Sequence, residues 1–139
     1  MKAAVFLDRD GVINELVLNH ATGEYEPPHS PENVVFVPGA IPALRELQRA
    51  GFELFLVSNQ PDYAKGKATL EQIHAVHDRL DYCLRSAGIQ FREYYYCYHH
   101  PTGIVSEYSF ICECRKPKPY FLLKSARDCD IDLEKSRLS

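Results

Sequence analysis

Three short apolar runs provide the framework of the chain. Residues 3–7, 53–57 and 93–96 each have the length and composition of a buried strand. Between the first two lies the segment 38–50, in which Ile, Leu and Leu recur at helical spacing. A strand, a helix and a strand in this order form a βαβ unit, so the pattern predicts a mainly parallel sheet with right-handed connections.

The helix predicted at 38–50 has clear end signals. Pro42 lies in its first turn, and Gly51 provides a stop just after its last residue. A third helix is expected from Tyr120 to about Asp128, directly after a segment rich in proline and lysine.

The clearest helix is the one predicted at 69–87. Thr69 and Gln72 have the spacing of a capping box at its start. His74 and His77 lie three residues apart on this helix, but no partner ligands are evident, so we interpret them as surface polar residues. One face of the helix is apolar and is expected to pack on the sheet: Ile73, Val76, Leu80, Leu84 and Ala87.

The segment 15–37 is rich in turn-forming residues and is predicted to be a long loop, with a short extended piece at 34–37. Long loops inside a compact domain are usually functional. We therefore expect this segment to form part of a cap over a site. The alternative is an insertion with no role.

Composition narrows the class of protein. The 139 residues suffice for one domain, and the hydrophobic fraction of 45% is ordinary for a globular protein. The net charge of −3 predicts no nucleic-acid partner, and no apolar run is long enough to cross a membrane. Five cysteines, three of them clustered, and no secretory signal are typical of a metal-binding protein of the reducing cytoplasm.

Two acidic residues follow the first strand. Asp8 and Asp10 are separated by one residue, so in an extended segment their side chains point the same way, at the edge where open α/β sheets bind ligands. Two carboxylates in one place repel each other unless a cation is present, and Mg²⁺ prefers such oxygen ligands. The alternative is an acidic turn in which Gly11 supplies a positive φ.

Further polar residues are expected near these acids. Ser58 and Asn59 end the second strand and therefore reach the same edge, where a hydroxyl and an amide suit phosphate oxygens. Arg115 and Lys116 could hold phosphate, arginine through a bidentate fork and lysine as a point charge. Each pair, taken alone, is equally compatible with an ordinary turn.

Cysteine and histidine spacing predicts a zinc site. Two close pairs of soft ligands flank a loop that contains proline and glycine and has few means of holding its own shape. Such a set suits a closed tetrahedral Cys₃His zinc site, which would order the loop. His100 is an alternative to the histidine in this set, and unrelated buried thiols are the alternative to zinc. The predicted ligands are Cys97, His99, Cys112 and Cys114.

Taken together, the motifs at 8–14, 57–60 and 97–117 resemble the haloacid dehalogenase superfamily of phosphatases. More narrowly, the chain resembles the histidinol-phosphatase and heptose-bisphosphatase branch. Its long zinc loop is more similar to that of enzymes acting on D-glycero-D-manno-heptose 1,7-bisphosphate at the 7-phosphate. The resemblance covers nearly the whole chain and implies a single Rossmann-like three-layer α/β/α domain over 1–139 with a zinc-stabilised loop.

The resemblance also implies roles for residues. Asp8 would attack phosphorus to form an aspartyl-phosphate, and Asp10 would act as general acid and then general base. Mg²⁺ would bind the Asp8 carboxylate and the backbone carbonyl of Asp10. Lys116 would hold phosphoryl oxygens together with Ser58.

Substrate orientation would fall to Asn59 and Arg115, and zinc would hold the loop that carries the arginine. The implied reaction is Mg²⁺-dependent hydrolysis of a small sugar phosphate. The alternatives are hydrolysis of histidinol phosphate and a catalytically silent phosphosugar-binding fragment.

The chain departs from the family pattern at its C-terminus. The fourth motif, a strand followed by acids that supply an Mg²⁺ ligand, is expected near Ser136, and the chain ends at Ser139. We therefore expect a domain truncated before that motif and lacking the last strand or strands, with an unpaired edge at strand 1. Weak Mg²⁺ affinity, low or absent turnover and self-association would follow, although the full-length protein would be a monomer.

Overall fold

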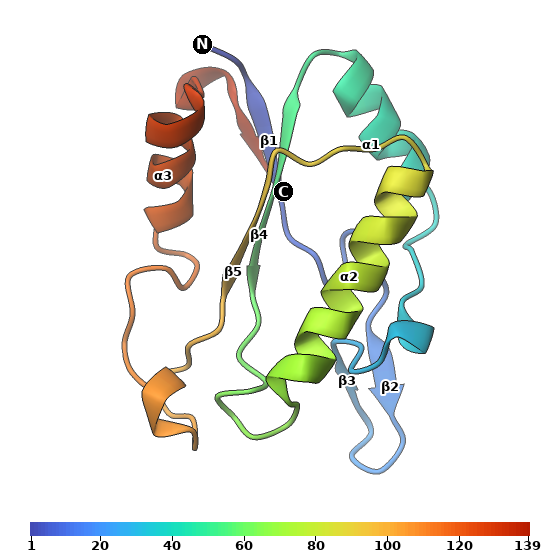
Figure 1. The fold of residues 1–139 in the computed structure, drawn as a ribbon, viewed down its shortest axis with the longest axis vertical. Coiled ribbons are helices and arrows are strands. Elements are labelled where there is room, and N and C mark those ends of the chain that lie inside the picture. Colours follow the sequence, from blue (N-terminus) through green and yellow to red (C-terminus); the bar gives the residue numbers. More distant parts are fainter.

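The protein, described over residues 1–139 by a computed structural model, has three layers (Figure 1). The central parallel sheet has the strand order β5-β4-β1-β6. Helices cover both faces of this sheet (Figure 1), which confirms the predicted α/β/α fold. The strands are β1 (Ala4–Leu7), β4 (Glu53–Asn59), β5 (Glu93–Cys97) and β6 (Arg137–Leu138); the helices are α1 (Ala40–Arg49), α2 (Leu70–Ser86) and α3 (Tyr120–Cys129).

Apolar side chains alternate between the two faces of the sheet and form a hydrophobic core on each face. Val5 and Leu7 of β1 face the side that carries α1 and α2, where Leu80 is fully buried. Phe6 faces the other side, in a cluster that packs against α3. Because β1 is buried on both faces, it reads as a continuous apolar run, and its carboxyl end is fixed in the middle of the sheet.

The predicted unpaired edge at strand 1 is wrong. Strand β6 pairs in parallel with β1, placing Arg137 opposite Val5 and Leu138 opposite Phe6. The backbone N–H of Asp8 donates to the carbonyl of Ser139 at 3.1 Å. A buried strand needs partners for its backbone groups, and the last three residues suffice to provide them along most of β1.

The segment 15–37 is more regular than the predicted loop. It forms an antiparallel hairpin of β2 (Val17–Asn19) and β3 (Glu24–Glu26), followed by the 3₁₀ helix η1 (Pro31–Asn33). The turn residues that suggested a loop close this hairpin: Asn19 Oδ1 accepts from the N–H of Ala21 at 3.0 Å. Beyond η1, the expected extended piece is reduced to one bridge between Phe36 and Asn14. A capping role for the segment stays a prediction.

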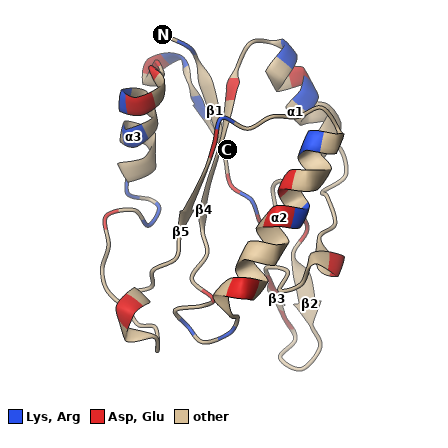
Figure 2. Ribbon diagram, viewed as in Figure 1, with Lys and Arg blue, Asp and Glu red and all other residues tan.

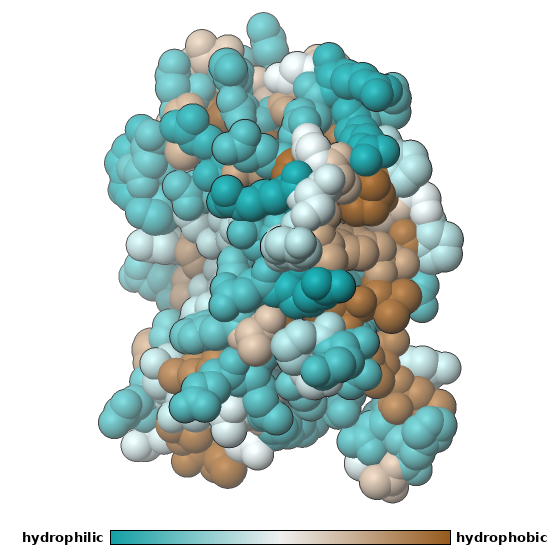
Figure 3. Space-filling model, turned by 45° about the vertical axis from the view of Figure 1, so that its right-hand side comes forward, coloured by the Kyte–Doolittle hydropathy of each residue, from teal (hydrophilic) through white to brown (hydrophobic).

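Hydrophobic side chains reach the surface on the side that carries α1, α2 and the hairpin (Figure 3). Those on or beside the hairpin are Leu16, Leu18, Tyr25 and Val35. Two further 3₁₀ helices, η2 (Ser106–Tyr108) and η3 (Leu133–Lys135), lie before and after α3. No helix combines the length and the apolar character that crossing a bilayer requires.

Helix α2 begins as predicted, with the reciprocal Thr69–Gln72 capping box. Its histidines differ from the predicted surface residues in one respect. His74 is exposed, but His77 is half-buried against β5, with its Nδ1 atom 2.7 Å from the hydroxyl of Tyr96. Burial raises the pKa of Tyr96 to about 12, so the phenol keeps its proton at neutral pH and can donate it to the unprotonated nitrogen of the imidazole.

We expect His77 to make the protein less stable in mild acid. Burial lowers the pKa of His77 below its ordinary value of 6.5, and the charges of Arg9 and His74 lower it further against the opposing effect of Asp78 and Asp81. The unfolded chain then binds a proton that the folded chain does not. The free energy of unfolding should therefore be highest above pH 6.5 and fall as the pH drops below it.

Urea unfolding at pH 7.5 and pH 5.5 would measure this loss. His77→Gln keeps an acceptor for the phenol but does not titrate, so its loss should be smaller than that of the unaltered protein. If the free energy of unfolding fell equally in the two proteins, His77 would not contribute to the pH dependence of stability.

Candidate functional site

The carboxyl end of β1 presents an exposed carboxylate next to a lysine. Asp8 Oδ2 lies 3.0 Å from Lys116 Nζ, and Asp8 Oδ1 accepts from the backbone N–H of Arg9 at 2.7 Å. The Asp8 side chain is 39% exposed, and that of Lys116 is 26% exposed. Figure 2 shows acidic and basic positions side by side in the segment that follows β1. Asp8 is therefore held in place by a cation and still open to a ligand.

Asp10 has a different set of partners from Asp8. Its carboxylate accepts from Arg9 Nε at 3.1 Å, from Asn14 Nδ2 at 3.1 Å and from Gln60 Nε2 at 2.6 Å. Arg9, Asn14 and Gln60 are each at most 2% exposed. The two acids therefore do not rely on one shared cation, as their spacing alone suggested, because each has its own.

Ser58 and Asn59 end β4 at the same edge as Asp8. The Ser58 hydroxyl is 1% exposed and accepts from Gln60 Nε2 at 2.9 Å, which leaves its own proton free to donate. Asn59 is bound to the backbone of Lys116: its Oδ1 accepts from the N–H at 3.0 Å, and its Nδ2 donates to the carbonyl at 3.4 Å. Asn59 thus fixes the segment that presents the lysine to Asp8.

A cavity of about 350 Å³ opens between Asp8 and α3. Lys116 and Lys118 contribute charge to it, while much of the remaining lining is apolar. Such a cavity has room for a small phosphorylated molecule, with a carboxylate and a cation at one end. The apolar side chains that line it are Val12, Val57, Pro117, Phe121, Leu122 and Leu138.

The donor set at the end of β1 fits a small hard cation. The Asp8 carboxylate is exposed, and the backbone carbonyl oxygen of Asp10 accepts no hydrogen bond. The turn that frees this carbonyl depends on Gly11, whose φ of 84° favours glycine, and on the bond from its N–H to the carbonyl of Asn14 at 2.7 Å. Oxygen donors of this kind suit Mg²⁺.

The four predicted zinc ligands come together between β5 and α3. Their ligand atoms all lie within 4.8 Å of one another. The sulfur–sulfur distances are 2.8, 3.4 and 3.6 Å, against about 3.7 Å for thiolates on one tetrahedral zinc ion. His100 is not in the cluster; its Nδ1 accepts from the N–H of Thr102 instead. The clustered residues are Cys97, His99, Cys112 and Cys114.

Three thiols and an imidazole this close together suit a metal ion that displaces the thiol protons. Burial raises the pKa of the Cys97 thiol, and it also raises that of Cys114. Neutral thiols packed this closely gain little from one another, whereas thiolates on Zn²⁺ gain strong bonds. The cluster is tied to the basic segment 115–118 because Arg115 Nη1 donates to the carbonyl of His99 at 3.4 Å and Lys118 Nζ donates to that of Cys112 at 2.6 Å.

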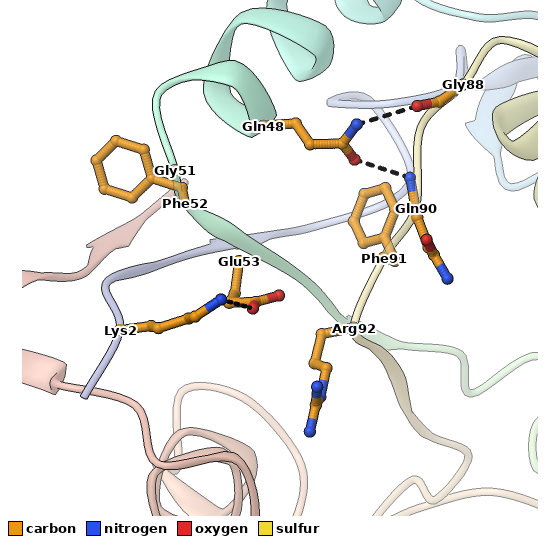
Figure 4. Close-up of a pocket in the computed structure, with 9 residues that line it drawn as sticks. All are labelled: Lys2, Gln48, Gly51, Phe52, Glu53, Gly88, Gln90, Phe91 and Arg92. Carbon is orange, nitrogen blue, oxygen red and sulfur yellow. Dashed lines mark hydrogen bonds and ion pairs between the residues drawn. The ribbon is translucent and has the colours of Figure 1, made fainter.

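A second polar cavity, of about 460 Å³, lies at the opposite edge of the sheet, where β4 begins (Figure 4). Most polar side chains of this cavity already have an ion-pair or hydrogen-bond partner within it. Lys2 pairs with Glu53 at 3.2 Å, and Gln48 bonds to the carbonyl of Gly88 and to the N–H of Gln90. Glu53 stands at the amino end of β4, whereas Asp8 follows the carboxyl end of β1, where ligands of parallel sheets bind, so the candidate site is the one at Asp8.

Sequence comparison finds relatives over nearly the whole chain, although no protein-family model matches it. D-glycero-β-D-manno-heptose-1,7-bisphosphate 7-phosphatases from Yersinia pestis and Pasteurella multocida are 41% and 37% identical to it over 133 and 132 residues. The chain spans 66% and 67% of their lengths, and 61% of the 42% identical relative from Escherichia coli K12. The chain therefore matches about two thirds of each relative.

Solved structures agree in fold. A HAD-like phosphatase from Mesorhizobium loti superimposes with a TM-score of 0.83 at 30% identity, covering 99% of this chain and 62% of that one. D,D-heptose 1,7-bisphosphate phosphatase from B. bronchiseptica, complexed with magnesium and phosphate, gives 0.73 at 30% identity over 95% of this chain and 65% of that one. By fold and by sequence, the chain belongs to the family of haloacid dehalogenase-like D-glycero-β-D-manno-heptose-1,7-bisphosphate 7-phosphatases.

Proposed function

We propose that this protein is a phosphatase that hydrolyses the 7-phosphate of D-glycero-D-manno-heptose 1,7-bisphosphate. The observation that carries the proposal is the exposed Asp8 carboxylate, 3.0 Å from Lys116 Nζ at the end of a cavity of about 350 Å³. A carboxylate beside a lysine can attack an anionic phosphoryl group because the cation offsets the repulsion between the two anions. The names of the relatives support the choice of substrate.

The reaction has two steps. In the first, an Asp8 carboxylate oxygen attacks phosphorus, the bond from phosphorus to the sugar oxygen breaks, and that oxygen takes a proton from Asp10. In the second, Asp10 takes a proton from water, the resulting hydroxide attacks phosphorus, and the aspartyl-phosphate bond breaks. Inorganic phosphate leaves, and Asp8 returns to its starting form.

The neighbouring cation and hydroxyl would hold the transferring group. Lys116 already lies on Asp8 and would bind a phosphoryl oxygen, while the free proton of Ser58 would donate to another. Arg115 would orient the substrate by reaching its remaining polar groups. Asn59 would act with it by holding the backbone of Lys116.

Two metal ions belong to this proposal. The Asp8 carboxylate and the Asp10 backbone carbonyl would hold Mg²⁺, which supplies positive charge against the phosphoryl oxygens. The Cys₃His cluster would hold structural zinc and so fix the segment that carries Arg115 and Lys116. We further propose that the protein works in the cytoplasm, as a monomer when full length, with a small phosphorylated sugar as its partner and no nucleic-acid or membrane partner.

Phosphate release from the heptose 1,7-bisphosphate and from histidinol phosphate, measured side by side with Mg²⁺ on one zinc-analysed sample, tests the proposal. We expect slow but measurable release, faster from the heptose substrate. Faster release from histidinol phosphate would move the assignment to that substrate. No release from either by a folded, zinc-loaded sample would contradict hydrolysis by this chain and favour a phosphosugar-binding role.

A further inference from the structure

Arg9, which lies between Asp8 and Asp10 in the sequence, is a buried cation. Its side chain is 1% exposed, and its guanidinium contacts Asp10 through Nε at 3.1 Å and Nη2 at 3.4 Å. Burying a guanidinium is costly, and a buried ion pair is often no more stabilising than apolar residues of the same size. One of its nitrogens, Nη1, is buried without a hydrogen-bond partner. Stability alone therefore does not account for this arginine.

Gln60 braces the same carboxylate from β4. Its Nε2 donates to Asp10 Oδ2 at 2.6 Å, and its Oε1 accepts from Arg9 Nη2 at 3.0 Å. The same Nε2 also donates to the Ser58 hydroxyl at 2.9 Å. Because both ends of the amide are used, Gln60 has one orientation, and Asp10, Arg9 and Gln60 form a closed ring of contacts.

Tyr96 connects this ring to helix α2. The guanidinium carbon of Arg9 lies 5.5 Å from the centroid of the Tyr96 ring, in cation–π contact. The Tyr96 hydroxyl bonds to His77 Nδ1 at 2.7 Å, and the His77 ring packs edge-on against the same tyrosine at 5.2 Å. The tyrosine is thus fixed at its face by Arg9 and at its tip by α2.

We propose that Asp10 is positioned from helix α2, through a chain of contacts that runs from His77 through Tyr96 and Arg9, with Gln60 as a second brace. Arg9 and Tyr96 are positioning residues that act on the substrate through Asp10. Gln60 is a positioning residue that acts through Asp10 and also through the hydroxyl of Ser58. The orientation of the Asp10 carboxylate therefore depends on how α2 packs on β5 as well as on the turn that contains Asp10. This inference rests on the proposed function, in which Asp10 transfers the proton.

Gln60→Met tests the brace by removing its hydrogen bonds to Asp10, Arg9 and Ser58 with a side chain of similar size. We expect kcat to fall by up to about 100-fold, because misplacing a proton-transfer group by 1 Å costs that much, with KM changed less than about threefold. Tyr96→Phe removes only the hydrogen bond to His77. It should lower kcat by a smaller factor than Gln60→Met does, again with little change in KM. An unchanged kcat in Gln60→Met, or a loss in KM alone, would overturn the inference.

Tyr94→Phe is the matched control. Tyr94 packs on the same side of β5 against His77, at 4.7 Å between ring centroids, but its hydroxyl bonds to Asp81 at 2.9 Å and not to the Asp10 ring. Its kcat should match that of the unaltered protein. Equal losses in Tyr94→Phe and Tyr96→Phe would reduce the effect to general packing of α2 and overturn the proposed chain.

A double-mutant cycle gives a readout that needs no turnover. Urea midpoints of Gln60→Met, Asp10→Ala and the double variant should be non-additive, because either single change already breaks the contact between the two residues. Additive shifts would overturn the inference even in an active protein. If the unaltered protein releases no phosphate but the midpoints are non-additive, then the proposed function fails while the positioning of Asp10 stands. If Gln60→Met does not fold, the double-mutant cycle is measured with Tyr96→Phe and Arg9→Lys instead. Additive shifts of their urea midpoints would likewise overturn the inference.

Discussion

Replacing Asp8 by asparagine should lower phosphate release by at least about 10³-fold, since an amide is a poor nucleophile towards phosphorus. Asparagine has nearly the shape of aspartate and can still accept from the backbone N–H of Arg9, so the fold and the zinc content should persist. Phosphate affinity should be kept or should increase, because the substitution removes a negative charge that repels the ligand. Steady-state release and direct phosphate binding by calorimetry measure the two effects.

Asp128→Asn is the control for this substitution. Asp128 lies on α3, where it pairs with Lys124 at 2.9 Å and Arg127 at 3.1 Å, away from the cavity. Its loss should leave phosphate release unchanged. Two results would refute the nucleophile assignment: release that persists in Asp8→Asn, or an equal loss in both variants. Loss of phosphate affinity along with turnover in Asp8→Asn would instead point to a binding role for the carboxylate.

What the sequence predicted well depends on short-range patterns. The strand that leads to Asp8 is an uninterrupted apolar run, and the Thr69–Gln72 capping box marks the start of α2 within one residue. The candidate zinc ligands could be chosen because cysteine is rare elsewhere in the chain, and the structure places His99, not His100, beside the three cysteines. In each case the residues that carry the signal lie close together in the sequence or belong to a rare residue type.

What the sequence missed depends on contacts between distant residues. The sequence patterns assign Arg9 no role, because no nearby residue indicates that Gln60 and Tyr96 will enclose it. Asn59 reads as a substrate-binding amide, yet it also binds the backbone of Lys116, 57 residues away. Pairing of β6 with β1 joins the two ends of the chain. A polar residue whose partner lies 50 or more residues away gives no local signal of burial.

Replacing Cys112 by serine should lower the melting temperature by roughly 10 °C, which for a domain of this size corresponds to about 3 kcal/mol. Cys112 is 8% exposed, and a serine hydroxyl is a much weaker zinc ligand than a thiolate. The loop that zinc closes also packs on the segment after β4, where the N–H groups of Ile104 and Val105 donate to the carbonyl of Ala64 at 2.7 and 3.0 Å. Loss of zinc should therefore loosen both segments.

Cys83→Ser separates this effect from the loss of any half-buried thiol. Cys83 lies on α2, outside the zinc cluster, so its substitution should shift the melting temperature little and leave one zinc per chain. In Cys112→Ser, zinc content should fall, and phosphate affinity should fall with it, because Arg115 donates to the carbonyl of His99 and would lose its anchor. If Cys112→Ser kept its zinc and its melting temperature, the cluster would not be a zinc site. If it lost zinc but kept its phosphate affinity, zinc would order the loop without positioning the arginine.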